Sequence, residues 1–470
     1  MLRPLFAVLA CSLALGVAGP ARSAEPLVQT SPGQHTDSYY PSVGSPTVDV
    51  QSYALDLHWQ PTTRTLDGVA RVRLVPTQDG TFRLDLSERL RVRGLSATDA
   101  AGTTVATTFQ HPGRSLVVSA PSMVAGTPYT VTVDYRGTPA PARAPSSRQD
   151  LSGLGWHTTL TGQVWAMQEP YGAFTWYPVN DHPSDKATYD VRLDVPEKWV
   201  GVSNGRMVSR MRAHGRTVTR FTSRDPMASY LATIAIGPYE RHTQTGPHGI
   251  PLTYWIPRDK PKYLAALRAT PGTLRWLESR LGPYPFDRAG VVVTPSDSAM
   301  ETQTMITFGA ENYRYGTREV QQTVAHELAH AWYGDTVTPD DWSDLWMNEG
   351  MAMYVEAEYS VARGWRSAAY WDREFSRSDA LWRKVYGPPG AYHRDQFAQI
   401  NVYYCAARMW GRLRQVVGAV AFDDLVRRWP QEHRNTVQDR ASFTAWLSAN
   451  TGRDLSPFFD EWLRSPAAPS

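Results

Sequence analysis

The sequence contains little cysteine. Only Cys11 and Cys405 occur among its 470 residues. Removal of an N-terminal signal would leave Cys405 alone, so an intrachain disulfide is excluded and the fold must be held together by its core. No activating residue pattern surrounds Cys405, so we do not expect it to act as a nucleophile.

The chain also carries little net charge. The 48 Lys and Arg residues nearly balance the 45 Asp and Glu residues, which gives a formal net charge of +3. No basic block stands out, so we expect no nucleic-acid partner. After the N-terminus, no apolar run reaches the roughly 20 residues that a membrane-spanning helix needs, so we expect no stable membrane insertion.

The longest apolar stretch lies at the N-terminus. A positively charged start precedes the run from Leu5 to Val17, and small residues follow. This pattern is typical of a signal peptide over residues 1–23, cleaved after Ser23 or after Ala24. A membrane anchor is the alternative, but the run is too short to span a bilayer. The N-terminus therefore predicts a secreted protein.

Two changes of pattern divide the remaining chain. Residues 24–45 are rich in Pro, Ser, Gly and Thr, which favours a flexible lead-in. Over residues 46–241 apolar and polar residues alternate, as in Tyr189–Val195, and this period of two predicts mostly antiparallel strands. Helical spacing dominates residues 242–470. The predicted fold class is therefore multidomain α+β, with a β domain before a mainly helical domain.

A histidine pair lies within one predicted helix. Val320 to Gly334 has the apolar spacing of a helix, and it contains the segment His326-Glu327-Leu328-Ala329-His330. A spacing of four places both imidazoles on one face, one turn apart, where both can reach one tetrahedral ion. Glu327 lies beside the metal position, where a base for a water molecule is needed. Two ordinary histidines on a helix are the alternative interpretation.

A third ligand makes the metal interpretation stronger. Glu349 begins a second predicted helix, and eighteen residues separate it from His330. Two imidazole nitrogens and one carboxylate leave the fourth zinc position open, which is the pattern of catalytic rather than structural zinc. The sequence predicts one Zn²⁺ per chain.

The segment from Val324 to Glu356 resembles the aminopeptidase N family of gluzincin zinc metallopeptidases. The hallmark of that family is this histidine pair with a glutamate after an eighteen-residue gap. The resemblance implies an N-terminal antiparallel β-sandwich or saddle domain followed by a thermolysin-like catalytic domain. It also implies a short, bacterial-type member, because the sequence does not continue into the large C-terminal helical domain of many members, and the signal-like N-terminus predicts that this member is secreted.

The resemblance also implies substrate-binding residues. Ser298 to Thr302 corresponds to the family's Gly-Ala-Met-Glu-Asn motif, in which Ala299 and Met300 line the substrate and Glu301 binds its amine. Glu169 falls where the family places a second amine-binding acid. On the sequence alone, both glutamates would be ordinary surface carboxylates. The stretch that follows Glu169, with Trp176-Tyr177-Pro178 and Asp181-His182-Pro183, resembles a segment that lines the family's cleft.

Two further residues take part in the predicted site. The segment Val402 to Ala406 corresponds to the stretch with the family's catalytic tyrosine, which we assign to Tyr403, with Tyr404 as the alternative because the flanking residues depart from the family pattern. Glu356 lies on the same helical face as Glu349 and could orient a ligand or be solvated.

These expectations together predict a zinc-dependent aminopeptidase. Glu327 would act as base, Tyr403 would donate to the oxyanion, and the partners would be peptides with a free N-terminus. The alternatives are an endopeptidase or another hydrolase on the same centre, and a non-catalytic peptide-binding relative. The sequence makes no prediction of the oligomeric state.

Overall fold

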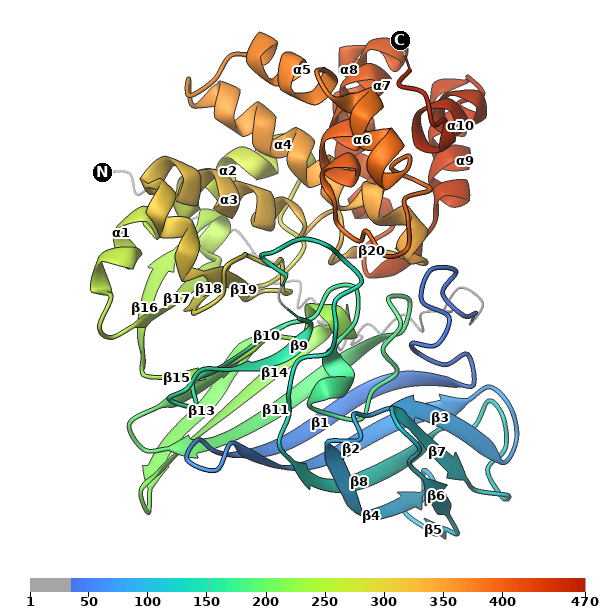
Figure 1. Cartoon of the computed structure of the whole chain (residues 1–470), viewed down its shortest axis with the longest axis vertical. Helices are drawn as coiled ribbons and strands as arrows, with labels where there is room; N and C mark the ends of the chain where they lie inside the picture. Colours follow the sequence, from blue (N-terminus) through green and yellow to red (C-terminus); the bar gives the residue numbers. More distant parts are fainter. Residues whose placement is uncertain (1–34, 152, 470) are drawn as a thin grey trace, which may run out of the picture. The chain divides into compact units, whose positions relative to one another are not determined.

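A computed structural model describes residues 35–151 and 153–469 (Figure 1). The predicted signal peptide, residues 1–23, and the start of the predicted lead-in lie outside these residues. Among the helices that the structure describes, none is long and apolar enough to cross a bilayer.

The first half of the chain is built around one eight-stranded sheet. Its strand order is β13-β14-β11-β1-β2-β8-β4-β5. The strands are β1 (Val48–Gln60), β2 (Thr65–Pro76), β4 (Leu90–Thr98), β5 (Thr104–Val105), β8 (Tyr129–Gly137), β11 (Lys186–Pro196), β13 (Arg206–Ala213) and β14 (Arg216–Ala228). Buried and more exposed residues alternate along β1 and β2, because one face of the sheet covers the core. Neighbours run antiparallel except β1 and β11, which are parallel.

Two smaller sheets complete this half. One has the order β3-β7-β6 and the other the order β12-β15-β10-β9. Their strands are β3 (Thr81–Asp85), β6 (Thr108–Gln110), β7 (Ser115–Ser119), β9 (Gly155–Thr158), β10 (Val164–Met167), β12 (Val200–Ser203) and β15 (Ile234–Gly237). The prediction of an N-terminal β domain is confirmed.

The second half begins with a small mixed sheet and continues mainly as helices. The sheet has the order β16-β17-β18-β19, formed by β16 (Tyr239–Thr245), β17 (Pro251–Pro257), β18 (Ala289–Thr294) and β19 (Ile306–Gly309). The helices are α1 (Leu264–Leu267), α2 (Thr270–Leu281), α3 (Thr317–Ala329), α4 (Glu349–Ala362), α5 (Ala368–Ser376), α6 (Asp379–Tyr386), α7 (Ala406–Val417), α8 (Ala419–Glu432), α9 (Arg440–Thr451) and α10 (Ser456–Arg464). Strands β20 (Val337–Pro339) and β21 (Thr436–Gln438) pair with each other. The predicted boundary between residues 241 and 242 falls inside β16, which pairs with β17 of the second half.

The two halves share part of their cores. Each half has its own cluster of buried apolar side chains. Met300, Trp342 and Phe397 come from the second half but pack in the cluster of the first. The halves therefore meet through an apolar contact, and residues from both can form one site.

Residues 35–38, in the described part of the predicted lead-in, pack against the second half instead of standing free. Buried Asp37 accepts a hydrogen bond from the Trp342 amide at 2.8 Å. The Ser38 amide and hydroxyl both donate to Asp341, at 2.6 and 2.7 Å. These partners lie 305 and 303 residues away in the sequence. A composition rich in Pro and Ser carries no signal for such distant partners.

Candidate active site

Helix α3 carries the histidine pair at its C-terminal end. The helix begins at Thr317 after Gly316, whose φ of 94° suits glycine. It ends at Ala329, earlier than the predicted Gly334, and His330 is its C-cap. Gly334 has a φ of 137°, and a Cβ there would lie 3.3 Å from His330 Nδ1. A glycine at this position lets the chain turn closely around the His330 ring.

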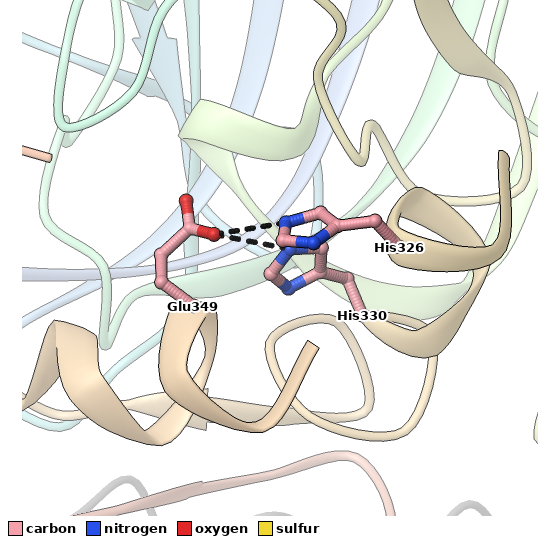
Figure 2. Close-up of side chains that lie close together, drawn as sticks. All are labelled: His326, His330 and Glu349. Carbon is pink, nitrogen blue, oxygen red and sulfur yellow. Dashed lines mark hydrogen bonds and ion pairs between the residues drawn. The ribbon is translucent and has the colours of Figure 1, made fainter. Parts of the chain in front are cut away.

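Helix α4 supplies the carboxylate that faces both histidines. Helices α3 and α4 pack against each other (Figure 1). Glu349 is the first residue of α4. Figure 2 shows its carboxylate directed at both imidazoles. Glu349 Oε2 lies 3.2 Å from His326 Nε2 and 3.4 Å from His330 Nε2.

The three donor atoms fit a zinc ion. Ligands at about 2.0–2.2 Å from a tetrahedral zinc lie about 3.3 Å from one another, close to the two separations between Glu349 and the histidines. Candidate ligand atoms of the three residues all lie within 4.8 Å of one another, and no other group of three or more possible ligands is found among the described residues. Two imidazoles and one carboxylate are a zinc donor set. The predicted ligands His326, His330 and Glu349 therefore form a zinc-type site.

The outer nitrogen of each imidazole is also occupied. His326 Nδ1 donates to Glu356 Oε2 at 3.0 Å, and Gln322 Nε2 donates to Glu356 Oε1 at 2.6 Å. His330 Nδ1 donates to the Tyr333 carbonyl at 3.1 Å. Protonation at Nδ1 leaves Nε2 as the metal-binding nitrogen. Glu356 was expected either to orient a metal ligand or to be solvated, and its hydrogen bond with His326 favours the first interpretation.

The charges around the ligands keep Glu349 ionised. Burial opposes its charge, but the two imidazoles that face it, His326 and His330, lower the pKa of Glu349 below its usual range. The position at the start of α4 favours the same charge, because a helix N-terminus stabilises an anion. Glu349 is therefore in the form that binds a metal.

Glu327 is buried beside the ligands. It is 8% exposed and lies on the same turn of α3 as His326. Burial raises the pKa of Glu327 to about 8, with smaller contributions from Glu301 and Glu349, while both histidines act to lower it. A carboxylate with its pKa near neutrality can both accept and return a proton.

Tyr403 and Tyr404 point to different surroundings. Both belong to a short π-helical turn, Asn401–Cys405. The Tyr403 hydroxyl donates to Glu349 Oε1 at 2.8 Å, and its ring stacks on His326 with centroids 6.0 Å apart. Tyr404 instead packs edge-on against Phe375 and Trp382. The geometry therefore favours Tyr403, the first assignment, as the tyrosine at the metal ligands.

One cleft of about 420 Å³ contains every predicted metal-binding, catalytic and amine-binding residue. The helices and the π-helical turn supply one wall, and loops supply the other. The predicted residues that line the cleft are Glu169, Ala299, Met300, Glu301, His326, Glu327, His330, Glu349, Glu356 and Tyr403, together with Tyr404. The fold thus brings residues from both halves of the chain into one cleft.

The loop with Glu301 is fixed by a small hairpin. The Met300 amide donates to the Thr307 carbonyl at 2.8 Å, and the Thr307 amide returns a bond at 3.1 Å. Thr302, which departs from the family motif, accepts a hydrogen bond from the Thr307 amide at 2.9 Å. The substitution therefore keeps the loop closed, and Glu301 is held in the cleft with only 3% of its surface exposed.

Glu169 and Glu301 each have a buried oxygen without a protein partner. Oε1 of both side chains is buried and makes no hydrogen bond. Burial, with repulsion from Glu301 next, raises the pKa of Glu169 well above its usual range. Burial also raises the pKa of Glu301, although His330 opposes this. An unpaired buried carboxylate is costly, and a cationic group placed between the two would remove that cost.

The resemblance implied that the segment with Trp176 and Asp181 lines the cleft, but neither residue is among the cleft's lining residues. The segment instead supports the loop that carries Glu169. Asp181 is buried and accepts hydrogen bonds from the Gly172 amide at 2.9 Å and the Ser229 hydroxyl at 2.7 Å. Trp176 Nε1 donates to Gln168 Oε1 at 2.9 Å, next to Glu169. The Asp181 carboxylate and the Trp176 indole N–H are therefore occupied in holding the loop.

Sequence reasoning did not find Arg148. This residue lies in the loop between β8 and β9, lines the cleft, and donates from Nη1 to the Tyr403 hydroxyl at 3.0 Å. An arginine in a stretch rich in Pro, Ala and Ser carries no local signal of such a contact. Cys405, in contrast, is fully buried, and burial raises its pKa, which agrees with the expectation that it is not a nucleophile.

Two models of known protein families match the chain, one in each half. The Peptidase M1 N-terminal domain matches residues 49–231, and the Peptidase family M1 domain matches residues 265–462. The matched ranges fall on either side of the boundary strand β16.

Two of the similar curated proteins are aminopeptidases of greater length. The chain is 26% identical to endoplasmic reticulum aminopeptidase 1 of Homo sapiens over 329 residues, which cover 65% of this chain and 34% of that protein. It is 30% identical to glutamyl aminopeptidase of Homo sapiens over 220 residues, or 43% of this chain and 23% of that protein. The matched region is thus about a third or less of the length of these relatives.

Solved structures match over nearly the whole chain. The M1 zinc metallopeptidase of Deinococcus radiodurans superposes with a TM-score of 0.78 at 25% identity, and the match covers 92% of this chain and 97% of that one. A mutant of that enzyme bound to a Tyr-Ser-Ala substrate gives the same TM-score and identity and covers 92% and 98%. The fold, the zinc-type ligand set and both domain matches agree, and the chain belongs to peptidase family M1.

Proposed function

We propose that the protein is a zinc-dependent aminopeptidase that hydrolyses the first peptide bond of peptides with a free amine. The observation that carries the proposal is the pair of unpartnered oxygens, Glu169 Oε1 and Glu301 Oε1, in the same cleft as the zinc-type ligands. Two carboxylates offer an ammonium the charge that it needs, and they position the bond that follows it near the ligands.

In this proposal His326, His330 and Glu349 hold the zinc. When bound, zinc supplies a Lewis acid that polarises a carbonyl and makes a water molecule more acidic. Glu327 takes the proton of the attacking water and passes it to the leaving amine.

Tyr403 and the loop wall complete the proposed site. The Tyr403 hydroxyl donates a hydrogen bond to the oxygen on which negative charge develops during attack, a contribution of about 3 kcal/mol for one such donor. Glu169 and Glu301 bind the substrate amine, and Ala299 and Met300 contact the first residues of the peptide. Glu356 keeps the His326 ring in the orientation that presents Nε2 to the metal.

The relatives support the same activity. Two of them are named aminopeptidases, and the Deinococcus radiodurans structure is described as bound to a tripeptide substrate. Export belongs to the proposal as well, on the strength of the signal-like N-terminal sequence.

The test combines zinc analysis with a panel of aminoacyl chromogenic substrates. Purified protein is expected to hold about one zinc per chain and to release the chromophore from substrates with a free amine. A chelator should abolish release, and added zinc should restore it. A protein that binds zinc but cleaves none of the panel would be an endopeptidase, another hydrolase or a binding protein, and the proposal would be wrong.

A further inference from the structure

The loop between β8 and β9 reaches from the β half of the chain onto the catalytic half. Its residues 145–148 run beside residues 396–399, just before the turn that carries Tyr403. The Phe397 amide donates to the Pro145 carbonyl at 2.9 Å, and the Ser146 hydroxyl donates to the Phe397 carbonyl at 2.8 Å. Gln399 Nε2 donates to the Ser147 hydroxyl at 2.9 Å. These hydrogen bonds fix the loop against the residues that immediately precede the turn with Tyr403.

Arg148 is the last residue of this contact, and its guanidinium lies against the Tyr403 hydroxyl. Nη1 donates to the Ala398 carbonyl at 2.8 Å and to the Tyr403 hydroxyl at 3.0 Å. Nε and Nη2 donate to the two oxygens of Asp150, at 3.0 and 2.5 Å. Four of the five N–H groups of the guanidinium are therefore used within the protein. One N–H is too few for a bidentate grip on a substrate carboxylate, so Arg148 does not have the geometry of a carboxylate-binding residue.

The direction of the Tyr403 proton follows from the chemistry of arginine. A guanidinium has only donors, so the phenol oxygen must accept the bond from Arg148. The phenol has a single proton, which is then available on the opposite side, where it is donated to Glu349 Oε1 at 2.8 Å. Accepting one bond also strengthens the bond that a hydroxyl donates. Arg148 thus holds the hydroxyl in place and keeps its proton directed at the metal ligands.

We propose that Arg148 is the positioning residue of Tyr403, so that it promotes the reaction through the tyrosine and not through contact with the substrate. The proposal rests on the proposed aminopeptidase function. It predicts that loss of Arg148 lowers kcat and leaves KM nearly unchanged, because the amine-binding carboxylates and the metal ligands stay in place.

The first test is a double-mutant cycle measured on the aminoacyl substrate that the wild type cleaves best. Arg148→Ala should lower kcat by about 10- to 100-fold, the usual cost of losing a residue that orients a catalytic group. In the Tyr403→Phe background the same substitution should change kcat little, because the hydroxyl that Arg148 holds is gone. Equal losses in both backgrounds would overturn the proposal.

A matched control separates this effect from loss of stability. Arg216, in the β half, has the same kind of environment: its side chain is 20% exposed against 25% for Arg148, and it donates to the Asp194 carboxylate and to backbone carbonyls. Arg216→Ala should leave kcat unchanged. Similar losses in both variants would contradict a specific role. Methylguanidine should partly restore kcat to Arg148→Ala, whereas methylammonium at the same concentration should not, and failure of this difference would also count against the proposal.

A binding measurement tests the proposal without turnover. The probes are an amine-bearing phosphinic dipeptide, whose tetrahedral oxyanion engages Tyr403, and free L-leucine, which needs only the amine site. Calorimetry should show that Arg148→Ala binds the phosphinic dipeptide about 10- to 100-fold more weakly and L-leucine as well as the wild type does. Equal weakening of both probes would overturn the proposal. A wild type that binds both probes but cleaves no substrate would refute the proposed function instead, so the two failures are distinguishable.

Discussion

The two walls of the cleft satisfy their polar groups in opposite ways. On the helical wall, Glu349 contacts both histidines and Tyr403, and each imidazole has a partner for its outer nitrogen. On the loop wall, Glu169 and Glu301 each keep one buried oxygen without a partner. A fully paired group is held ready for chemistry, whereas an unpaired buried carboxylate is completed only by a ligand. In the proposed function, this difference separates the metal ligands and Tyr403 from the carboxylates that select the substrate.

The base on the helical wall should show the largest effect. Glu327→Gln keeps the shape of the side chain but cannot accept a proton, so kcat should fall by about 10²- to 10⁴-fold. Zinc content, measured by atomic absorption, should stay at the wild-type value because Glu327 is not a ligand. Retained activity in the zinc-loaded variant would mean that another group is the base.

The tyrosine pair should show the next largest effect. Tyr403→Phe removes the hydroxyl at Glu349 and should lower kcat by about 10²- to 10³-fold, the cost of one oxyanion donor. Tyr404→Phe is the matched control, since that ring packs against Phe375 and Trp382. It should stay within a few-fold of the wild type in steady-state kinetics. The reverse pattern would reassign the role to Tyr404.

A smaller effect should separate the unpaired carboxylates from a paired one. Glu301→Gln should lower kcat/KM for free-amine substrates by about 10- to 100-fold, through the loss of a charge-assisted hydrogen bond. Asp181→Asn, in a buried carboxylate whose oxygens are all occupied, should instead reduce the free energy of unfolding by about 1–3 kcal/mol. Urea titration and kinetics on both variants provide the comparison, and a stability loss confined to Glu301→Gln would contradict it.

The contact between the halves should give a pH-dependent effect on stability alone. Lys186, from β11, is buried and donates to the Asp335 and Thr336 carbonyls at 2.8 and 3.1 Å. Burial lowers its pKa to about 7 from the ordinary 10.5. Between these values the unfolded chain binds more protons than the folded one, so this group makes stability rise with pH.

The variant Lys186→Met should lack this contribution. From pH 7 towards pH 10 the wild type should gain stability over the variant by up to about 1.4 kcal/mol per pH unit, measured from urea unfolding at each pH. Parallel stability curves for the two proteins would show that Lys186 titrates normally.

The helical wall could be predicted from the sequence because its geometry is local. A spacing of four fixes the relation of His326 to His330, and the family-like spacing to Glu349 added the third ligand. The order of a β domain and a helical domain followed from periodicity in the same way. The parallel pairing of β1 with β11 did not, because periodicity is the same for both strand directions.

The loop wall could not be predicted in the same detail, because its contacts join distant parts of the chain. Arg148 meets Tyr403 across 255 residues. Asp181 was expected in the cleft, but backbone amides and Ser229 use its oxygens. A pattern of residue types shows which groups are chemically able to bind a substrate, and only the fold shows which of them are already occupied.

One measurement tests the amine requirement most directly. A peptide and its N-acetylated twin are incubated with the zinc-loaded protein, and the products are identified by mass spectrometry. Acetylation removes the charge that we propose Glu169 and Glu301 bind, so the free peptide should lose its first residue while the acetylated peptide stays intact. Equal cleavage of the two peptides would contradict the account.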